Sequence, residues 1–496
     1  MSRWLVSLVI VSAGVAWASV DAGGGTISIG NSLRYSLSQE TNEEILEDYF
    51  DVDYTHGPFL ARLRYEVFQP SEERRDREGQ VFRAVGGETQ WGTLWVGNFY
   101  GLFGKGMAFH GYEDRDLRVD TSLDGLSLDL EHGPASLKAF SGRTAAHTTV
   151  FHGADAEVRP LAGLALGGSY LSRRQTSSTG YVAPDLELGT GRIDVNVNPV
   201  GCFGLDVGPT YLSAEAGQRS RSGAAERGEG WFAAVGTSLL GAAVGFEYKD
   251  YLHMGVVAEG KEYTTPPPAA MEHAWTLLAR HSHELNPDDE KGFLGRLEWQ
   301  ATDIFGLTAS YSVAQDQRDT EVFSEAMAEA RIAEVSRTPV TVACARTEEF
   351  LGVAPTADRN VDDRRTHLTF IGDVTFPLHG PWTGRFSGEH QHTDGDAVGE
   401  FDLEHLELEV SRSPGISVAL VGEFSNVSRI QQDLPWLSVF EEQTSWFSAQ
   451  CVLDIAPGHQ LRVVAGSRPE GKVCAGGACR TVPAFKGIEA QLSSLF

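Results

Sequence analysis

The chain has 496 residues, and 68 Asp and Glu against 40 Lys and Arg give it a formal net charge of −28. A surface this acidic repels a polyanion, so the composition argues against a nucleic-acid partner. The 55 glycines are about 11% of the residues against a usual ~7%, which favours strands and turns over helices.

The N-terminal residues have the pattern of a secretory signal peptide. Arg3 precedes an apolar stretch from Trp4 to Trp17, and Ala16-Trp17-Ala18 matches the small-x-small cleavage pattern. We therefore expect residues 1–18 to be removed on export and residues 19–496 to form the mature protein.

Apolar and polar residues alternate in segment after segment, which is the pattern of strands with one apolar face. In the first segment the apolar set is Ile27, Ile29, Leu33, Tyr35 and Leu37, and the polar set is Ser28, Gly30, Ser32, Arg34 and Ser36. Short turns separate some segments and longer polar loops separate others, as in a meander of hairpins whose ends face different compartments. The chain contains about 24 such segments, with a range of ~20–26 because predicted boundaries shift by several residues.

The block at residues 97–125 combines glycines with many charges. Gly104-Lys105 suggests a phosphate loop, but the Walker spacing is absent and neither Ser nor Thr follows the lysine. Charges cannot face lipid cheaply, so we expect the block to fold into the lumen of a barrel. It would bring there a polar constellation of Tyr112, Glu113, Arg115, Asp120 and Asp124. We favour a network that holds an inner loop over a substrate site, and both interpretations stay open.

The apolar run from Trp231 to Phe246 is a candidate transmembrane helix. It has 16 residues, fewer than the ~20 that a bilayer core requires, and it contains several glycines. Leu240-Gly241 in its middle suits a tight turn. The run therefore predicts a hairpin of two strands.

The block from His273 to Gly292 contains Asn286-Pro287-Asp288-Asp289, a turn signal that predicts a hairpin. Arg280 and His281 are candidate lumen residues of this hairpin. His281 and His283 would share a strand face, as would His390 and His392, and such pairs can bind a metal. No third ligand is evident, so we expect ordinary lumen or rim histidines, no metal and no cofactor.

The stretch from Val322 to Val335 is rich in Glu, Ala and Met, which favours a helix. It could equally form a strand paired with Pro339–Arg346. Both interpretations stay open.

Two of the five cysteines, Cys474 and Cys479, close a Cys-Ala-Gly-Gly-Ala-Cys loop. In an oxidising compartment this loop predicts a disulfide, and in a reducing one it could be half of a metal site. A second pair of thiols at zinc spacing is absent from the sequence, so we favour the disulfide.

The last residues alternate as Ile488, Ala490, Leu492 and Ser494 and end at Phe496. A final strand with a terminal aromatic is the signal read by the barrel assembly machinery of Gram-negative bacteria. No second apolar layer is evident to cover the apolar strand faces, which favours a membrane barrel over a soluble sandwich. We predict an all-β, large antiparallel transmembrane β-barrel with meander topology, in contact with outer-membrane lipid.

Three blocks, at residues 97–125, 266–292 and 473–484, resemble a family of exported proteins of Gram-negative bacteria that is catalogued as a domain of unknown function. The blocks occur in the same order and span most of the mature chain. The resemblance implies an outer-membrane protein, and it supplies no catalytic residue.

A barrel of more than ~16 strands encloses a lumen too wide for side chains alone to fill. The leading hypothesis is a channel or transporter for a polar solute, with the polar strand faces lining the passage. The alternative is a structural or assembly component with an occluded lumen, which binds a periplasmic or exported protein through a rigid rim hairpin at Cys474–Cys479. The sequence contains no nucleophile elbow, so we do not expect an enzyme.

Overall fold

The computed structural model describes residues 20–22, 24–40, 43–69, 77–175, 185–197, 207–221, 227–332, 338–355, 360–395, 399–426 and 444–496. The predicted signal peptide, residues 1–18, lies outside the described residues. None of the helices in the described ranges has the length and apolar character that crossing a bilayer requires.

In the described part of the chain, 24 strands form a ring. They are β2 (Gly25–Ser38), β3 (Glu43–His56), β4 (Phe59–Gln69), β5 (Arg77–Thr89), β6 (Gly92–Phe99), β11 (Leu123–His132), β12 (Ala135–Arg143), β13 (Thr149–Leu161), β14 (Leu164–Gln175), β15 (Leu186–Val197), β16 (Val207–Arg221), β17 (Gly228–Leu239), β18 (Ala242–Leu252), β21 (Asp289–Thr302), β22 (Phe305–Gln315), β23 (Glu321–Ile332), β24 (Val340–Pro355), β25 (Asn360–Pro377), β26 (Trp382–Gly395), β27 (Gly399–Arg412), β28 (Ile416–Ser425), β29 (Ser445–Ala456), β30 (His459–Arg468) and β33 (Phe485–Leu495). A short strand, β1 (Val20–Ala22), pairs with the start of β2.

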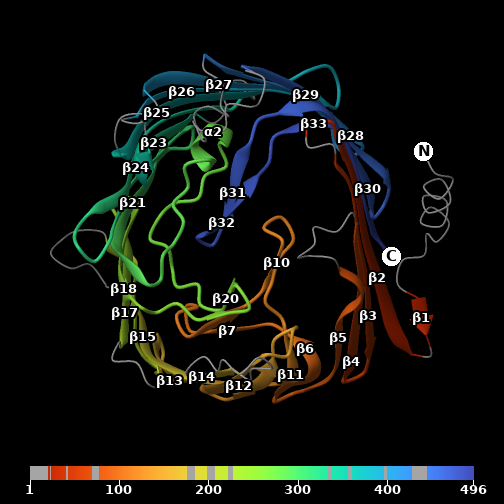
Figure 1. Cartoon of the computed structure of the whole chain (residues 1–496), viewed down its shortest axis with the longest axis vertical. Coiled ribbons are helices and arrows are strands. Elements are labelled where there is room, and N and C mark those ends of the chain that lie inside the picture. Colours follow the sequence, from red (N-terminus) through yellow and green to blue (C-terminus); the bar gives the residue numbers. More distant parts are fainter. Residues whose placement is uncertain are drawn as a thin grey trace.

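Each strand of the ring pairs antiparallel with the next, and β33 pairs with β2 to close the barrel (Figure 1). The backbones of Phe496 and Ile29 extend this closure, with hydrogen bonds of 2.7 and 3.0 Å. The prediction of an all-β antiparallel meander barrel of about 24 strands is confirmed. Closure pairs every described strand of the ring with a neighbour on both sides, which a barrel in lipid requires.

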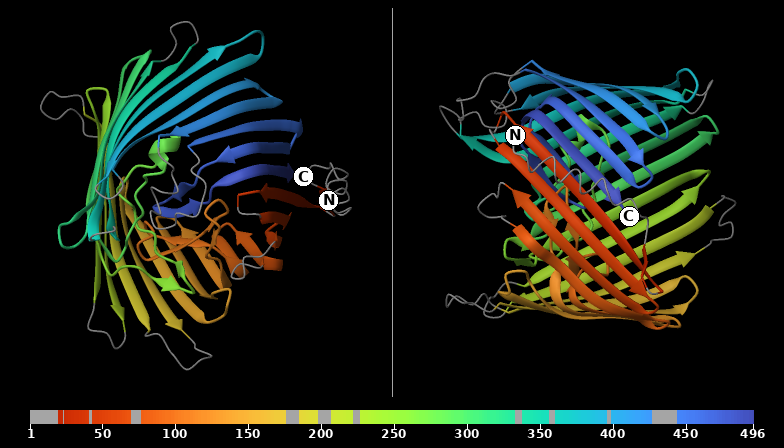
Figure 2. Two further views of the ribbon diagram at one scale, coloured as in Figure 1. Left: turned by 45° about the horizontal axis from the view of Figure 1, so that its top comes forward. Right: turned by 90° about the vertical axis from the view of Figure 1, so that its right-hand side faces the viewer.

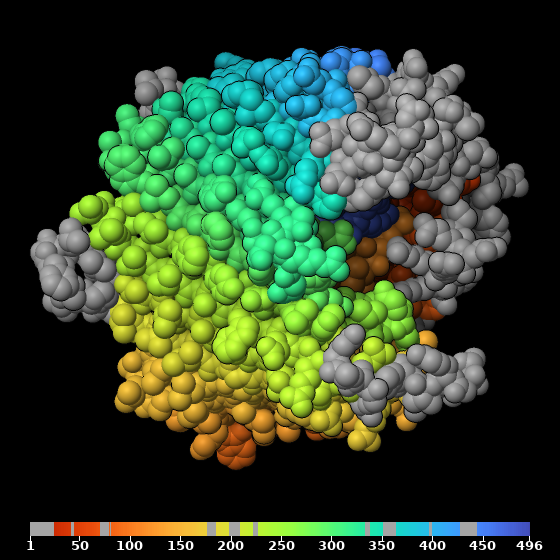
Figure 3. Space-filling view, turned by 60° about the vertical axis from the view of Figure 1, so that its left-hand side comes forward, coloured from red at the N-terminus to blue at the C-terminus, as the bar shows by residue number. Residues whose placement is uncertain are grey.

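The outer surface of the barrel carries exposed apolar side chains. On β18, Phe246 and Tyr248 are exposed, whereas Lys249 and Tyr251 are buried against chain inside the barrel. Large apolar side chains are exposed all around the ring, for example Val96, Leu126, Tyr170, Tyr211, Trp231, Tyr311, Phe370, Leu408, Leu420 and Phe447. Figure 3 shows the wall as a continuous surface from the yellow to the cyan strands. An apolar surface of this extent is suited to contact with lipid.

The run from Trp231 to Phe246 forms the hairpin β17–β18, as predicted. Leu240 and Gly241 connect the strands with φ angles of 53° and 79°. Two successive positive φ values belong to a type I′ turn, whose twist matches that of the flanking strands. In the stretch from Val322 to Val335, the residues up to Ile332 form a strand, because β23 pairs with β24 over Phe323–Ile332, and residues 333–335 lie outside the described residues.

The hairpin predicted for His273–Gly292 is wrong. Only Asp289–Gly292 belong to a barrel strand, and the preceding residues run inside the barrel with one helical turn, α2 (Thr276–Ala279). His281 and His283 therefore do not share a strand face. The local turn signal at Asn286–Asp289 marks the return of the chain to the wall, where Asn286 N donates to Glu290 Oε2 at 2.7 Å.

Candidate functional site

Three segments between barrel strands lie inside the lumen (Figures 1 and 2). The first inward segment, residues 100–122, contains β7 (Gly101–Phe103), β8 (Phe109–Gly111), β9 (Glu113–Asp114) and β10 (Val119–Asp120). The second, residues 253–288, contains β19 (Val257–Ala258), β20 (Lys261–Glu262) and α2. The third, residues 469–484, is the hairpin of β31 (Gly471–Ala475) and β32 (Ala478–Val482).

All three inward segments depart from the barrel wall at the same rim. They follow β6, β18 and β30, which run in the same direction as β2 because neighbouring strands are antiparallel. The chain enters β2 and leaves β33 at the opposite rim. Among the described residues, one mouth of the barrel therefore supplies all three inward segments.

The inward segments bind one another through the backbone. His110 N donates to Tyr263 O at 2.8 Å, and Thr265 N donates to Gly106 O at 3.1 Å, which joins the first segment to the second. Leu285 N donates to Gly477 O at 2.9 Å, which joins the second to the third. The third also reaches the first through Arg480 Nη1, 3.0 Å from Asp116 O. The three segments thus form one connected structure inside the barrel.

An apolar cluster fixes the first and second segments to the wall. Phe103, Met107, Phe109 and Tyr263 are almost fully buried against wall residues that include Phe140, Phe151, Leu171, Leu188 and Phe232. The ring centroids of Phe109 and Phe140 are 4.5 Å apart. Over this arc, from β12 to β17, the expectation that polar strand faces line the whole passage is wrong at the positions of this cluster, where apolar side chains on the inner face pack against the inward segments. Other inner positions of the same strands are polar, for example Asp155, Thr190 and Glu215.

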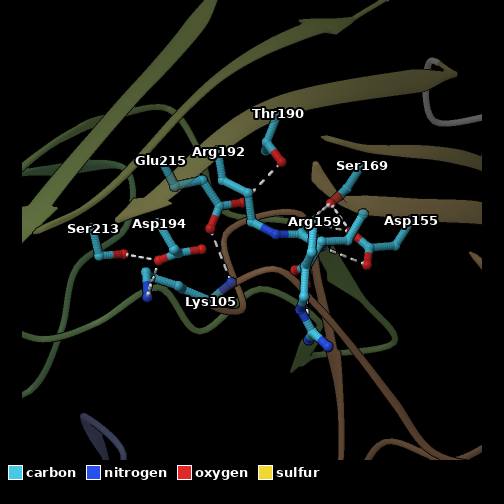
Figure 4. Close-up of polar contacts among 10 residues, drawn as sticks. Lys105, Asp155, Arg159, Ser169, Thr190, Arg192, Asp194, Ser213 and Glu215 are labelled. Atoms are coloured by element: carbon cyan, nitrogen blue, oxygen red, sulfur yellow. Dashed lines mark hydrogen bonds and ion pairs between the residues drawn. The ribbon is translucent and has the colours of Figure 1, made fainter. Parts of the chain in front are cut away.

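The turn of the first segment at Gly104-Lys105 docks on a polar part of the wall (Figure 4). Lys105 N donates to Glu215 Oε2 at 2.9 Å, and Lys105 Nζ lies 3.6 Å from Asp194 Oδ1. Thr190 Oγ1 donates to Glu215 Oε1 at 2.8 Å and holds the carboxylate in place. Gly104 has a φ of 55°, and a Cβ there would lie 2.5 Å from Glu215 Oε1. The Gly-Lys pair is therefore a docking turn, not a phosphate loop.

An ion network attaches the other part of the first segment to β3 and β4. Arg115 Nη2 lies 2.9 Å from Asp51 Oδ2, and Arg64 Nη1 lies 2.7 Å from Glu113 Oε1. Arg115 Nε and Glu113 Oε1, 3.1 Å apart, complete the arrangement. The Arg115 guanidinium also lies over the ring of Tyr49, 4.4 Å from its centroid. Charges alternate in sign in this network, so each one lowers the cost of burying its neighbours.

The three inward segments and the wall strands β3 and β4 enclose a cavity of about 630 Å³. Eight acidic side chains line it, Glu47, Glu66, Glu113, Asp114, Asp120, Glu259, Glu262 and Glu284, against the three basic ones Arg115, Arg118 and Lys261. We call it the acidic cavity. Arg118 Nη2 lies 2.8 Å from Glu47 Oε1, and Lys261 Nζ donates to Asp120 O. The bases are thus already engaged by the protein, and the cavity retains a strong acidic excess.

The carboxylates of the second segment differ in their surroundings. Burial raises the pKa of Glu262 above its ordinary value, although the N–H of Val256 donates to it at 2.8 Å. Burial also acts on Glu259, but hydrogen bonds from the hydroxyls of Thr144 and Thr148 outweigh it and lower the pKa of that carboxyl. Glu259 therefore stays ionised at lower pH than Glu262.

We expect His110 to make the contact between the first two segments pH-dependent. Its Nδ1 is hydrogen-bonded to Thr265 Oγ1, its ring stacks on Tyr112, and burial lowers the pKa of His110 below 6.5. The docked state favours the neutral ring, so the stability of docking falls as the pH drops below 6.5 and an undocked ring takes up a proton. We expect hydrogen-exchange protection of residues 100–122 to decrease severalfold over this range.

The variant His110→Gln provides the control for this pH dependence. It retains a hydrogen-bonding side chain but has no titrating ring. Protection of residues 100–122 should then decrease less below pH 6.5 than it does in the wild type. An equal loss of protection in the variant and the wild type would contradict the role of His110.

The residues predicted from the sequence divide into three groups. Tyr112, Glu113, Arg115 and Asp120 line the acidic cavity. Asp124 lies outside it on β11, where its Oδ2 is 3.7 Å from Arg83 Nη2. Arg280 and His281 belong to the second segment but contact other wall strands, at Glu423 on β28 and Glu349 on β24.

The structure joins Cys474 to Cys479 by a disulfide at the tip of the third segment. The predicted rim position of this hairpin is wrong, because β31 and β32 lie inside the barrel (Figure 1). Contacts with the second segment hold it there, among them Lys472 Nζ to Ser282 O at 3.1 Å. Asp51, Arg64 and Glu262 were not predicted as site residues from the sequence. The alternation of β3 and β4 places Asp51 and Arg64 on an inner face, and this pattern could have identified both as lumen residues.

A model of a protein family matches residues 26–313, more than half of the chain. It is described as a family of unknown function, DUF6029. The chain belongs to this family. The match covers the first two of the three sequence blocks and the whole of the first and second inward segments. The comparison with curated protein sequences gives no match.

Solved structures of low sequence identity share the fold. An assembly intermediate of the Escherichia coli P pilus tip, PapC-PapD-PapK-PapG, matches with a TM-score of 0.51 and 11% identity over 97% of this chain and 62% of that one. The siderophore receptor PirA from Pseudomonas aeruginosa matches with a TM-score of 0.46 and 8% identity over 95% and 80%. The closed ring of 24 strands and the match at a TM-score of 0.51 show that the protein has the fold of a large outer-membrane β-barrel.

Proposed function

We propose that this protein transports a polar, positively charged solute across the bacterial outer membrane, with its inward segments acting as a built-in plug. The observation that carries the proposal is the acidic cavity, which is enclosed by all three segments and not by the wall alone. A solute that enters the barrel at the rim from which the inward segments depart meets this cavity within the lumen. Long connections usually face the cell exterior in such barrels, so we assign that rim to the exterior.

The charge of the acidic cavity favours cations. Carboxylates in a confined space with low-dielectric walls focus the field and raise the local concentration of counter-ions. The three bases in the cavity are engaged by Asp51, Glu47 and the Asp120 carbonyl, so they are poorly placed to attract an anionic solute. A solute with amino or guanidino groups, or a hydrated metal cation, fits this chemistry.

Ion selectivity in planar lipid bilayers tests the proposal. Replacing Glu259, Glu262 and Glu284 by Gln removes three of the carboxylates without removing volume. We expect the cation-to-anion permeability ratio, taken from the reversal potential in a salt gradient, to fall by at least about twofold. Glu262→Gln alone should reduce the ratio less at acidic pH than at neutral pH, because the raised pKa of Glu262 already neutralises it as the pH falls.

The control variant is Glu88→Gln, at an exposed position near the end of β5 and outside the cavity. It should leave the permeability ratio unchanged. If the triple variant and this control give the same ratio as the wild type, the ions do not pass the acidic cavity and the proposal fails.

A second candidate function is a structural or partner-binding barrel whose lumen stays closed. The apolar cluster favours it, because Met107 and Phe109 are completely buried and their undocking would expose large apolar surfaces. This candidate predicts no conductance in bilayers, and the purified barrel would carry a bound exported or periplasmic protein. Conductance that changes with the cavity carboxylates would exclude it.

A further inference from the structure

Three side chains from distant parts of the sequence meet where the second inward segment touches the wall. His281 comes from that segment, Glu349 from β24 and His367 from β25. His281 Nδ1 lies 3.0 Å from Glu349 Oε1, and His367 Nε2 lies 3.1 Å from the same oxygen. The two imidazole rings stack with their centroids 3.7 Å apart. The exposed fraction of the His367 side chain is 1%, and those of His281 and Glu349 are 12% and 15%.

The ligand atoms have the separations of a metal site. All three lie within 4.8 Å of one another. Metal–nitrogen and metal–oxygen bonds of about 2.0–2.2 Å in a tetrahedral site place neighbouring ligand atoms roughly 3.3–3.5 Å apart. Two histidines and one carboxylate are also a ligand set that binds divalent transition metals well.

The second nitrogen of each ring is held by an oxygen. His281 Nε2 lies 3.1 Å from Gln391 Oε1, and His367 Nδ1 lies 2.8 Å from Thr393 Oγ1. Gln391 Nε2 donates to Thr369 Oγ1 at 2.9 Å, which orients the amide so that its oxygen faces His281. An amide oxygen can only accept, so the proton of a neutral His281 lies on Nε2. The nitrogen lone pair on Nδ1 then faces the carboxylate, and a cation between them would relieve their repulsion.

We propose that His281, Glu349 and His367 bind a divalent transition-metal cation such as Zn²⁺, with water completing the coordination. Gln391 and Thr393 act as the outer partners that orient the two rings, as is usual around metal-bound histidines. One ligand belongs to the inward segment and two belong to the wall. The cation therefore pins the second segment to β24 and β25, whether or not a solute passes the acidic cavity.

Metal titration of the full-length barrel tests this site. After treatment with a chelator, the purified protein is titrated with Co²⁺, whose visible absorption reports nitrogen and oxygen ligands, and then with Zn²⁺ in competition. We expect one tight site per chain. His281→Ala and His367→Ala should each weaken binding by more than about 100-fold, and Gln391→Leu by about 10- to 100-fold. Heat-dependent gel migration verifies that each variant retains its barrel.

The control is His390→Ala on β26, because this half-exposed histidine lies near Glu404 and outside the cluster. It should bind Co²⁺ with the affinity of the wild type. Hydrogen exchange supplies a second readout: Zn²⁺ should increase the protection of residues 253–288 in the wild type but not in His281→Ala. Absence of a tight site in the wild type, or equal binding by wild type and His281→Ala, would overturn the proposal.

Discussion

Replacing Phe109 with Ala is expected to release the first inward segment from the wall and raise the conductance of the barrel. Phe109 is completely buried and contacts the rings of Phe103, Phe140, Phe151 and Tyr263. Truncation of a buried Phe costs about 3–5 kcal/mol through lost burial and the cavity that remains. Because the barrel ladder does not involve this side chain, most of that cost should fall on docking of residues 100–122.

Hydrogen exchange of residues 100–122 and single-channel recording measure the effect of Phe109→Ala. The matched control is Leu102→Ala, in the same segment, because the Leu102 side chain is 43% exposed. This variant should change docking by less than about 0.5 kcal/mol, as surface substitutions usually do. Full protection of the segment in Phe109→Ala would show that the polar contacts alone hold it.

The variant Glu290→Leu is expected to destabilise the protein by about 3–5 kcal/mol, because it leaves a buried ammonium without its carboxylate. Lys249 and Glu290 have side-chain exposures of 0% and 1%, and they form an ion pair across β18 and β21. Glu290 also binds the second segment, through His283 Nε2 at 2.8 Å and Asn286 N at 2.7 Å. The measurement is the free energy of unfolding by guanidinium in lipid vesicles.

The double variant Lys249→Met, Glu290→Leu separates the buried charge from the lost hydrogen bonds. Buried ion pairs can often be replaced by apolar residues of similar volume with little loss. We expect the double variant to recover most of the stability that Glu290→Leu loses. If it is no more stable than the single variant, the loss comes from the contacts with His283 and Asn286, and our account of the ion pair is wrong.

The barrel could be predicted because its pattern is local. Each strand alternates over ten or so residues, and the turn at Leu240-Gly241 needs only its two central residues to define it. The path of residues 253–288 could not be predicted in this way. Its position depends on partners far away in the sequence, such as Glu389, which accepts hydrogen bonds from Thr276 N and Leu277 N at 2.7 Å.

The candidate site was predicted only in part, because local patterns reveal some of its residues and contacts between distant residues determine the others. The charges of residues 112–120 pointed to the lumen because lipid would exclude them, and four of the five predicted residues line the acidic cavity. The apolar positions on the inner face between β12 and β17 were not foreseen, because alternation shows which residues share a face but not what covers it. Likewise, His281 had no visible third ligand, since Glu349 and His367 are 68 or more residues away.

Each inward segment begins and ends beside a pair of residues that face each other across one strand pair: Phe99 and Leu123, Leu252 and Asp289, and Arg468 and Phe485. Both ends of every segment are therefore anchored at a single point of the wall. Such a loop can swing about its anchor or refold, but it cannot be withdrawn from the lumen as a free domain. If an inward segment is displaced to open the barrel, it therefore stays attached to the wall at the rim from which it enters the lumen.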